Sequence, residues 1–497
     1  MTSLARALPR EKGVDSRLLA GFLDTVAAEK MELHSFLIYR SGAIVAEGYW
    51  HPYAADRLHM QHSSTKSWTA TGIGFLIDDG LVKFEDKVVT FFPDDLPPQV
   101  SEHLAAMTVR DLLTMRTGHK TGISGGEWRG SRESWVKAFF REEVSDPPGK
   151  TFIYSSASSY MLSAIVTKVT GRTLHEFLEE RLFAPLGMGK ILWDLSPEGF
   201  NTGGNGLRCV SEDVVKFGVL HLNKGVRDGT RILSKEWVEA ATSNQVDEVW
   251  MGALDGKRFL APGTPGAAPA EKREGYGYQW WMTAHGGYRA SGLYGQQCIV
   301  LPEQDAVIVF TGGLKPRDPR LMDAVYSQII PALSGKADAE ADEALEVRLK
   351  NLAMDVPDGV PASPTSEAVN GNIYVAEEND AGIKAIELSF DGSLVSLRLE
   401  DHRGSHIVTA SCNGLHEGST TMTGNTLHHE YQPDLMVCLA NAAWISDRHL
   451  QLQWRFVETA FCDTVDCRFG DEGMTFDRQV NTNAGPLRMP TVTAHHR

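Results

Sequence analysis

A serine and a lysine three residues apart, Ser63 and Lys66, form the pattern in this chain that is best suited to chemistry. Three residues make about one helical turn, so the two side chains share one face of a helix. A serine hydroxyl is a weak nucleophile until a neighbouring base accepts its proton. A lysine is such a base when burial or a nearby cation lowers its pKa toward neutrality. The apolar run 67–77 predicts a buried helix with Ser63 at its N-terminus, where free backbone N–H groups favour negative charge.

The same spacing occurs a second time, at Ser134 and Lys137. Roughly one or two matches to so short a pattern are expected by chance in a chain of this length. Around Ser134 the apolar residues Trp135, Ala138 and Phe139 have the spacing of an amphipathic helix, with Lys137 on the polar face. We therefore interpret Ser134 as structural and Ser63 as the candidate nucleophile.

Two further segments could complete a site around Ser63. Tyr154 and Ser156 stand just before an apolar helix predicted at 161–166, and a phenol near a lysine ammonium can pass a proton to a leaving group. The segment 290–297 combines small residues with a tight turn before a strand-like run. Such a turn lets a substrate carbonyl approach backbone N–H groups, as an oxyanion site requires.

Together these elements resemble the serine β-lactamase and penicillin-binding family, in which Ser-x-x-Lys is a catalytic motif. The resemblance covers about residues 15–335. Besides the three motifs, it extends over the segments 34–50, 108–119, 179–188, 203–208 and 275–281. It implies an α+β fold, with an antiparallel sheet flanked by helices and a helical region inserted between its N-terminal and C-terminal strands.

The resemblance also implies a role for each candidate. Ser63 would attack the substrate carbonyl and form an acyl-enzyme, while Lys66 accepts its proton. Tyr154 would relay a proton to the leaving group and then activate the deacylating water. The backbone amides of Ser63 and of the strand near Leu293 would hold the oxyanion, although the turn could also register at Ala290 or Ser291. The expected oxyanion and substrate-binding residues are Ser156, Ser291, Gly292, Leu293, His285 and Trp128.

Two departures narrow the branch of the family. In the family, the usual third motif is Lys-Thr-Gly or His-x-Gly on the strand beside the site. Here the strand at 288–292 has the sequence Tyr-Arg-Ala-Ser-Gly, and His285 lies upstream of it. Ser156 stands where class C β-lactamases carry asparagine. Both changes remove groups that would hold the carboxylate and amide of a β-lactam. The chain is therefore more similar to family VIII carboxylesterases and to 6-aminohexanoate-dimer hydrolase.

Other patterns were weighed against structural explanations. The segment 122–126 matches the Gly-x-Ser-x-Gly nucleophile elbow, but no strand is predicted before it, so we expect a loop beside the site. His62 could form a Ser–His pair, yet this chemistry needs no histidine. Large aromatic residues either line an acyl pocket or pack in the core. Both alternatives stay open for Trp128, Trp280 and Trp281, whereas Tyr160 is expected in the core.

Composition excludes several function classes. The chain has 497 residues and a net charge of −16, so electrostatic binding to nucleic acid is not expected. No apolar run reaches the length of a membrane span. The segment 1–13 lacks the apolar core of a secretory signal, which predicts a cytoplasmic protein. The six scattered cysteines are then expected to be free thiols. No metal-binding spacing is present, so we expect neither a metal nor another cofactor.

The chain is long enough for at least two domains. We predict a hydrolase domain at 1–335, a linker with a charged helix and several prolines at 336–365, and a third segment at 366–497. The third segment contains short runs of alternating apolar and polar residues separated by turns. This pattern is typical of an antiparallel β sandwich or barrel. It carries no motif that we can connect to chemistry.

The sequence thus predicts a serine hydrolase that cleaves carboxylic esters or small amides. Alternatives within the family are a D-amino-acid peptidase or amidase, and an acyltransferase in which an alcohol replaces water. A catalytically silent binding scaffold is a third possibility, which the intact Ser63, Lys66 and Tyr154 argue against. The expected partner is a small-molecule substrate, whose identity depends on loops at 117–130 and 245–275. Oligomeric state is left open.

Overall fold

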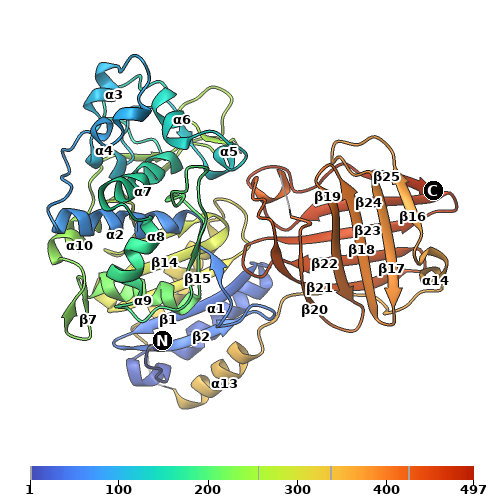
Figure 1. The fold of residues 1–497 in the computed structure, drawn as a ribbon. Helices are drawn as coiled ribbons and strands as arrows, with labels where there is room; N and C mark the ends of the chain where they lie inside the picture. The colour runs from blue at the N-terminus through green and yellow to red at the C-terminus, as the bar shows by residue number, and fades with distance from the viewer. Residues whose placement is uncertain (1–2, 256, 336–337, 424–425) are drawn as a thin grey trace. The chain divides into compact units, whose positions relative to one another are not determined.

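The structure, a computed structural model, describes residues 3–255, 257–335, 338–423 and 426–497. The chain divides into two compact units, Met1–Leu352 and Ala353–Arg497 (Figure 1). Positions 336 and 337, where the predicted linker begins, lie outside the described residues.

One antiparallel sheet organises the first unit and joins strands from both of its ends. The strand order is β12–β13–β14–β15–β1–β2. The strands are β1 (Leu33–Arg40), β2 (Ala43–Tyr49), β12 (Trp281–Met282), β13 (Tyr288–Gly292), β14 (Gln296–Leu301) and β15 (Ala306–Gly312). β1 lies beside β15, with Phe36 opposite Phe310, so the N-terminal hairpin completes the sheet of the later strands. The predicted α+β architecture is confirmed.

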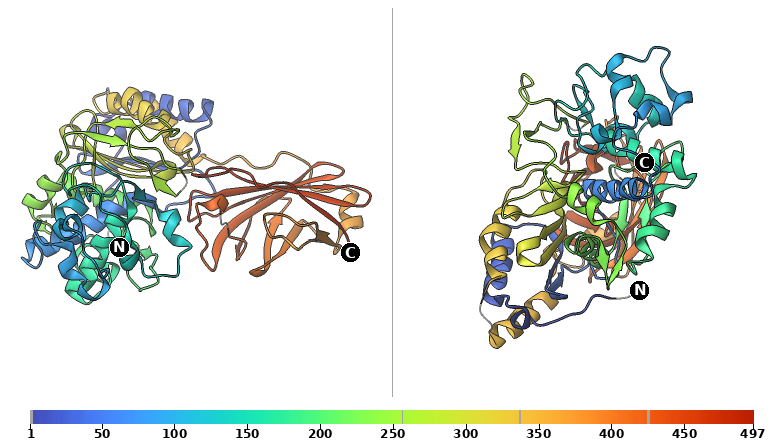
Figure 2. Two further views of the ribbon diagram at one scale, coloured as in Figure 1. Left: turned by 90° about the horizontal axis from the view of Figure 1, so that it is seen from above. Right: turned by 90° about the vertical axis from the view of Figure 1, so that its left-hand side faces the viewer.

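Helices cover both faces of this sheet because successive strand residues point to opposite sides. On one face, Phe22 of α1 (Ser16–Ala28) lies 5.1 Å from Phe36 and 5.8 Å from Phe310, measured between ring centroids. On the other face, Leu37 and Val309 join the core that contains α9 (Ser211–Leu222). Figure 2 shows α1 and the inserted helical region on opposite sides of the sheet.

The inserted helical region lies between β2 and β12, as the sequence predicts. Its longer helices are α2 (Thr65–Asp78), α6 (Trp135–Arg141), α7 (Ser156–Thr170), α9 and α10 (Lys235–Ala241). Short helices connect them: α3 (Glu102–Ala106), α4 (Val109–Leu113), α5 (Gly125–Arg129) and α8 (Leu174–Leu178). Helix α2 is buried from Thr65 to Leu76, and its Trp68 stacks on Phe217 at 3.8 Å. A helix that is buried all round forms the centre of the domain.

The second Ser-x-x-Lys match is a helix cap. Ser134 is the N-cap of α6, and its Oγ accepts a hydrogen bond of 3.2 Å from the backbone N–H of Lys137. The Lys137 side chain is exposed, while Trp135 and Phe139 are buried. The structural interpretation of this pair is therefore confirmed.

The helix predicted in the linker, α13 (Ala339–Lys350), packs within the first unit. Leu345 and Leu349 are buried, and Arg348 donates a 3.0 Å hydrogen bond to the carbonyl of Ala20 in α1. A Cβ on Gly48 of β2 would stand only 2.8 Å from Leu349. The first unit therefore extends beyond residue 335 to Leu352, because the apolar stripe of α13 is covered by α1 and β2.

The second unit is a β-barrel. Its strands are β16 (Ile373–Ala376), β17 (Ala385–Asp391), β18 (Leu394–Asp401), β19 (Gly404–Ser411), β20 (His416–Thr420), β21 (Met436–Ser446), β22 (His449–Arg455), β23 (Cys462–Phe469), β24 (Gly473–Val480) and β25 (Val492–His496). Neighbouring strands follow the order β19–β18–β17–β16–β25–β24–β23–β22–β21, with β20 beside β21. A parallel pair between Ser411 and Asn441 joins β19 to β21 and closes the ring. Of the two predicted architectures, the barrel is the one observed.

Cysteine pairing and membrane-spanning helices can both be assessed for the described residues. Cys462 and Cys467 lie on the single extended strand β23, so they are too far apart to form a disulfide with each other. None of the helices in the described ranges is long and apolar enough to cross a membrane.

Candidate active site

Ser63 and Lys66 lie where a short 3₁₀ turn, η2 (His62–Ser64), continues into α2. The side-chain nitrogen of Lys66, Nζ, lies 3.1 Å from Ser63 Oγ. Ser63 is partly exposed, whereas Lys66 is only 1% exposed. The nucleophile candidate therefore faces solvent, and the base candidate lies behind it in the protein interior.

Lys66 has three neighbours that suit a neutral amine. Besides Ser63, its Nζ contacts Ser156 Oγ at 3.1 Å and the carbonyl oxygen of Gly204 at 2.7 Å. Burial lowers the pKa of Lys66 to about 7, and the positive charge of Arg129 contributes to this shift. A neutral amine has two N–H groups and one lone pair. Its N–H groups can serve Gly204 and Ser156, which leaves the lone pair for the Ser63 hydroxyl.

Tyr154 lies next to this pair, among other aromatic side chains. Its ring centroid lies 5.0 Å from Lys66 Nζ, 4.9 Å from the ring of Phe259 and 5.3 Å from that of Trp281. Burial raises the pKa of the Tyr154 hydroxyl, and its hydrogen bond with Ser63 acts weakly in the other direction. At neutral pH Tyr154 is therefore a phenol, which can donate a proton but is a poor base.

The end of strand β13 comes within van der Waals range of the serine turn. A Cβ on Gly292 would stand 2.3 Å from the carbonyl oxygen of Gln61 and 3.2 Å from the backbone nitrogen of Ser64. Only glycine permits this approach. The Gln296 side chain donates a 3.0 Å hydrogen bond to the carbonyl of Leu293, which fixes the peptide between Leu293 and Tyr294 at the end of this strand. The geometry suits an oxyanion site formed by backbone N–H groups of Ser63 and Leu293.

A buried glutamine joins the elements that carry these groups. Gln279 donates to the carbonyls of Leu112 and Leu113, at 3.1 and 2.9 Å, and accepts from Ser159 Oγ on α7 at 2.6 Å. The backbone carbonyl oxygen of Gln279 accepts a hydrogen bond from Ser67 Oγ on α2, also at 2.6 Å. Gln279 thus fixes α2 and α7 relative to each other, and with them Lys66 and Ser156.

Ser63 opens into a cleft of about 410 Å³. One wall comes from the loop 245–275, where β10 (Arg258–Phe259) pairs with β4 (Gly122–Ile123). Arg258 forms ion pairs with Glu127 at 2.6 Å and with Glu142 at 2.9 Å. These contacts place Phe259 against Tyr154 in the cleft. The loop that the sequence left undefined is therefore tied to the inserted helices.

Three predicted or suspected site residues lie elsewhere. His285 is exposed in the turn between β12 and β13, at the opposite end of β13 from Gly292, so the strand itself separates it from Ser63. Trp128 is in the core, with its ring 5.6 Å from Tyr160 and 5.3 Å from Trp135. Trp280 is also buried in the core, next to Phe217, whereas Trp281 lines the cleft. Sequence spacing cannot distinguish these two faces of an aromatic run.

The Gly-x-Ser-x-Gly match is not a nucleophile elbow. Ser124 caps α5, and its backbone N–H donates to the carbonyl of Lys257 at 2.9 Å. A Cβ on Gly122 would overlap the carbonyl oxygen of Tyr154, so this segment is packed directly behind the site. It supports the Tyr154 loop and belongs to the wall of the site.

Two residues of the site were missed by the sequence analysis. Gly204 acts through its carbonyl, and its only sequence signal is the glycine-rich segment 203–206. Arg289 lines the cleft from β13. It could have been found from the alternation of side-chain directions along the strand, which puts Arg289 on the same face as Ser291.

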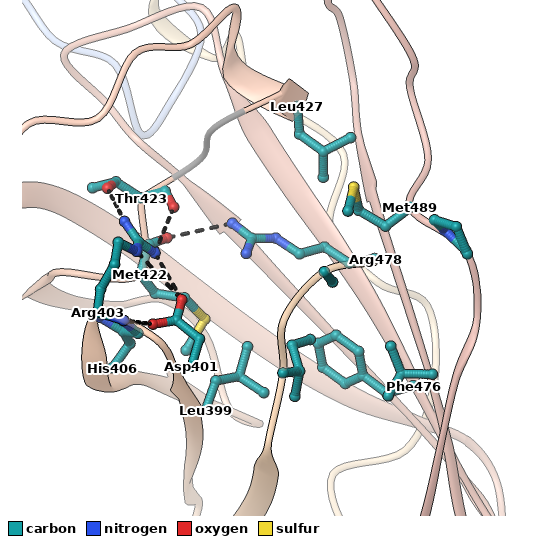
Figure 3. Close-up of a pocket in the computed structure, with 14 residues that line it drawn as sticks. Leu399, Asp401, Arg403, His406, Met422, Thr423, Leu427, Phe476, Arg478 and Met489 are labelled. Atoms are coloured by element: carbon teal, nitrogen blue, oxygen red, sulfur yellow. Dashed lines mark hydrogen bonds and ion pairs between the residues drawn. The ribbon is translucent and has the colours of Figure 1, made fainter. Parts of the chain in front are cut away.

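The barrel contains a smaller pocket of about 40 Å³ (Figure 3). Its charged groups bind one another: Asp401 Oδ1 lies 2.9 Å from His406 Nε2, and Arg403 forms an ion pair with Asp401 at 3.2 Å. Arg478 contacts the carbonyl of Met422 at 3.4 Å. Groups paired in this way stabilise the barrel and leave little for a ligand. Within the described ranges, no cluster of His, Cys, Asp and Glu is placed to hold a metal ion.

Comparison with known proteins agrees with this geometry. The β-lactamase family model matches residues 23–327. The 6-aminohexanoate-dimer hydrolase of Paenarthrobacter ureafaciens is 26% identical over 321 residues, which cover 61% of this chain and 79% of the relative. The lovastatin esterase of Penicillium rubens is 27% identical over 159 residues, covering 28% of this chain and 40% of the relative.

A solved structure has a similar fold. It is a Bacillus anthracis protein provisionally named a 6-aminohexanoate-dimer hydrolase, with a TM-score of 0.52 and 20% identity. The match covers 67% of this chain and 87% of that protein. At this identity the similarity concerns the fold alone.

Proposed function

Since the chain belongs to the β-lactamase family, we propose that it is a serine hydrolase that cleaves carboxylic esters or small amides through an acyl-enzyme on Ser63. The observation that carries the proposal is the pair formed by Ser63 Oγ and Lys66 Nζ, 3.1 Å apart, in which burial lowers the pKa of the lysine to about 7. A nucleophile beside a base of this pKa is the arrangement that covalent catalysis requires.

Acylation begins with neutral Lys66. Its lone pair accepts the proton of Ser63 while Oγ attacks the substrate carbonyl. The oxyanion that forms is stabilised by the backbone N–H groups of Ser63 and Leu293. As the tetrahedral intermediate collapses, the leaving oxygen or nitrogen takes a proton from Tyr154, which is replenished from the Lys66 ammonium. Ser156, bonded to Lys66, keeps the amine directed at the reacting atoms.

Deacylation repeats these steps with water. Lys66 is neutral again once its proton has left with the product, and it accepts a proton from water through the Tyr154 hydroxyl. The attacked carbonyl is now that of the Ser63 ester, and the same backbone amides hold its oxyanion. Ser63 Oγ leaves and regains a proton from Lys66. An alcohol in place of water would give acyl transfer from the same intermediate.

Esters are the first candidates because an alkoxide or phenolate needs less protonation to leave than an amine does. The experiment that tests the proposal is hydrolysis of p-nitrophenyl esters from acetate to octanoate, beside 6-aminohexanoate dimer and nitrocefin. We expect ester hydrolysis, and the preferred substrate decides between the ester and amide alternatives. No turnover of any of these by the wild type would favour the silent scaffold and contradict the proposal.

The pH dependence of ester hydrolysis reports on Lys66. Only the neutral amine accepts a proton, and burial together with Arg129 lowers its pKa to about 7. We expect kcat/KM for p-nitrophenyl butyrate to rise about tenfold per pH unit below that pKa and to level off above it. Tyr154 remains protonated here, because burial raises its pKa. A profile that is flat through neutral pH would contradict the assignment of Lys66 as the base.

A further inference from the structure

A guanidinium group lies in the wall of the cleft. Side chains of β13 alternate between two environments: Tyr288 and Ala290 are buried in the core, whereas Arg289 and Ser291 line the cleft into which Ser63 opens. Arg289 is therefore held on a strand of the central sheet. A rigid element of this kind positions a binding group more closely than a loop does.

Arg289 forms no ion pair among the described residues, and the carboxylate of Glu274 in the same cleft attracts it only at longer range. Two other arginines of the same cleft, Arg273 and Arg317, both pair with Glu271. Arg289 Nε, by contrast, is buried and has no hydrogen-bond acceptor in the part of the chain that the structure describes. Burial lowers the pKa of Arg289, but a guanidinium stays charged at neutral pH. A partly buried cation without a directly bound counter-ion costs stability, so its presence in a cleft needs an explanation.

A short polar array orients this guanidinium. Arg289 Nη1 donates to Gln297 Oε1 at 3.3 Å, and Gln297 Nε2 donates to Ser291 Oγ at 3.0 Å. Ser291 and Gln297 are directly opposite each other in the β13–β14 pair. The side-chain amide of Gln297 thus accepts a hydrogen bond from one nitrogen of the guanidinium. The remaining N–H groups of Arg289 have no charged acceptor among the described residues.

We propose that Arg289 binds a carboxylate of the substrate, so that the preferred ester or amide carries this anion several bonds from the scissile carbonyl. The proposal rests on the proposed function, because it names the substrate class of the same cleft. The planar guanidinium fork matches a carboxylate through two parallel hydrogen bonds. The three residues from Arg289 to Gly292 span roughly 10 Å of extended strand, so a carboxylate next to the carbonyl is too close.

Matched pairs of esters test this selectivity. p-Nitrophenyl hydrogen adipate against p-nitrophenyl hexanoate probes an anion on the acyl side, and 4-acetoxyphenylacetate against phenyl acetate probes the leaving-group side. We expect wild type to prefer the anionic member of one pair, and Arg289→Gln to lower that preference about 10- to 100-fold. Lys315→Gln, which removes an exposed charge from the same cleft, should change it less than about twofold. No preference in either pair, or one that survives Arg289→Gln, would overturn the proposal.

A binding measurement separates this proposal from the catalytic one. In a Ser63→Ala background, we expect calorimetry to show that Arg289→Gln weakens binding of adipate monomethyl ester or 4-acetoxyphenylacetate about 10- to 100-fold. Arg289-dependent binding without any turnover by wild type would sink the proposed function and keep this inference. Suppose instead that wild type turns over neutral esters, and that the Ser63→Ala protein binds the anionic esters equally well with and without Arg289→Gln. This result would support the proposed function and overturn the inference about Arg289. Arg289→Met should also raise Tm, since it removes a buried charge, and a large fall in Tm would indicate a structural role.

Discussion

Replacing Ser63 by alanine is expected to lower kcat/KM for p-nitrophenyl butyrate by at least about 10⁴-fold. The variant keeps the cleft, Lys66 and the backbone amides, but it has no hydroxyl to form the acyl-enzyme. The residual rate then comes from binding and oxyanion stabilisation alone. Tm should change little, because Ser63 is partly exposed and its side chain bonds to Lys66 and Tyr154.

The chain offers a matched control in Ser134, which has the same spacing to a lysine. Ser134→Ala removes the hydrogen bond to the Lys137 backbone N–H, and we expect it to lower the free energy of unfolding by about 1 kcal/mol. Its kcat/KM should stay within about twofold of wild type. If Ser63→Ala retained activity, or if Ser134→Ala lost it, the nucleophile assignment would be wrong.

Lys66→Met is expected to lower kcat/KM by about 10²- to 10⁴-fold at pH 8 and to remove the rise of activity near pH 7. Methionine has a similar length but cannot accept a proton. Among the described residues, buried Lys66 contacts Ser63, Ser156 and Gly204 and has no carboxylate partner, so its loss should leave Tm unchanged or raise it.

A second buried lysine provides the contrast. Lys216 on α9 is 3% exposed and lies 2.9 Å from Asp213, and it is not among the described residues that line the cleft. Lys216→Met leaves a buried carboxylate unpaired, and we expect it to destabilise the protein by about 3–5 kcal/mol. Activity per folded molecule should be kept. A Lys66→Met variant with undiminished activity at pH 8 would show that another group is the base.

The sequence predicts the proximity of Ser63 and Lys66 well because this information is local. The interval between Ser63 and Lys66 and the apolar run after it require one helical turn and one buried helix, and both are present. The segment around Tyr154 was placed by its position before α7 and by the family resemblance. These features depend on short-range spacing, which the backbone geometry translates directly into proximity.

The substrate side of the site depends on long-range packing and was predicted less well. His285 and Trp128 have suitable chemistry, but the direction of β13 and the packing of α5 on Tyr160 put them elsewhere. Gly204 contributes a backbone carbonyl, which a residue type does not reveal. The strand lacks the usual third motif, which suggested that no group for a carboxylate was left. Arg289 was overlooked because only the sheet register shows that it faces the cleft.

The barrel shows the same limit. Alternating runs after residue 366 predicted strands, but a sandwich and a barrel share this pattern. The ring needs both the pair formed by Ser411 and Asn441 and the pairing of β16 with β25, two strands at opposite ends of this unit's sequence. Likewise, the charged appearance of 338–350 suggested a linker, and only packing against α1 and β2 assigns α13 to the first unit.

The central claim is that Ser63 is the residue that becomes acylated, and the most direct test is mass spectrometry after reaction with a fluorophosphonate. We expect one phosphonyl adduct per chain, located on the peptide that contains Ser63 and absent from Ser63→Ala. Labelling should rise with pH through about 7, because neutral Lys66 activates the hydroxyl. An adduct on Ser124 or Ser134, or no adduct on a folded protein that hydrolyses esters, would contradict it.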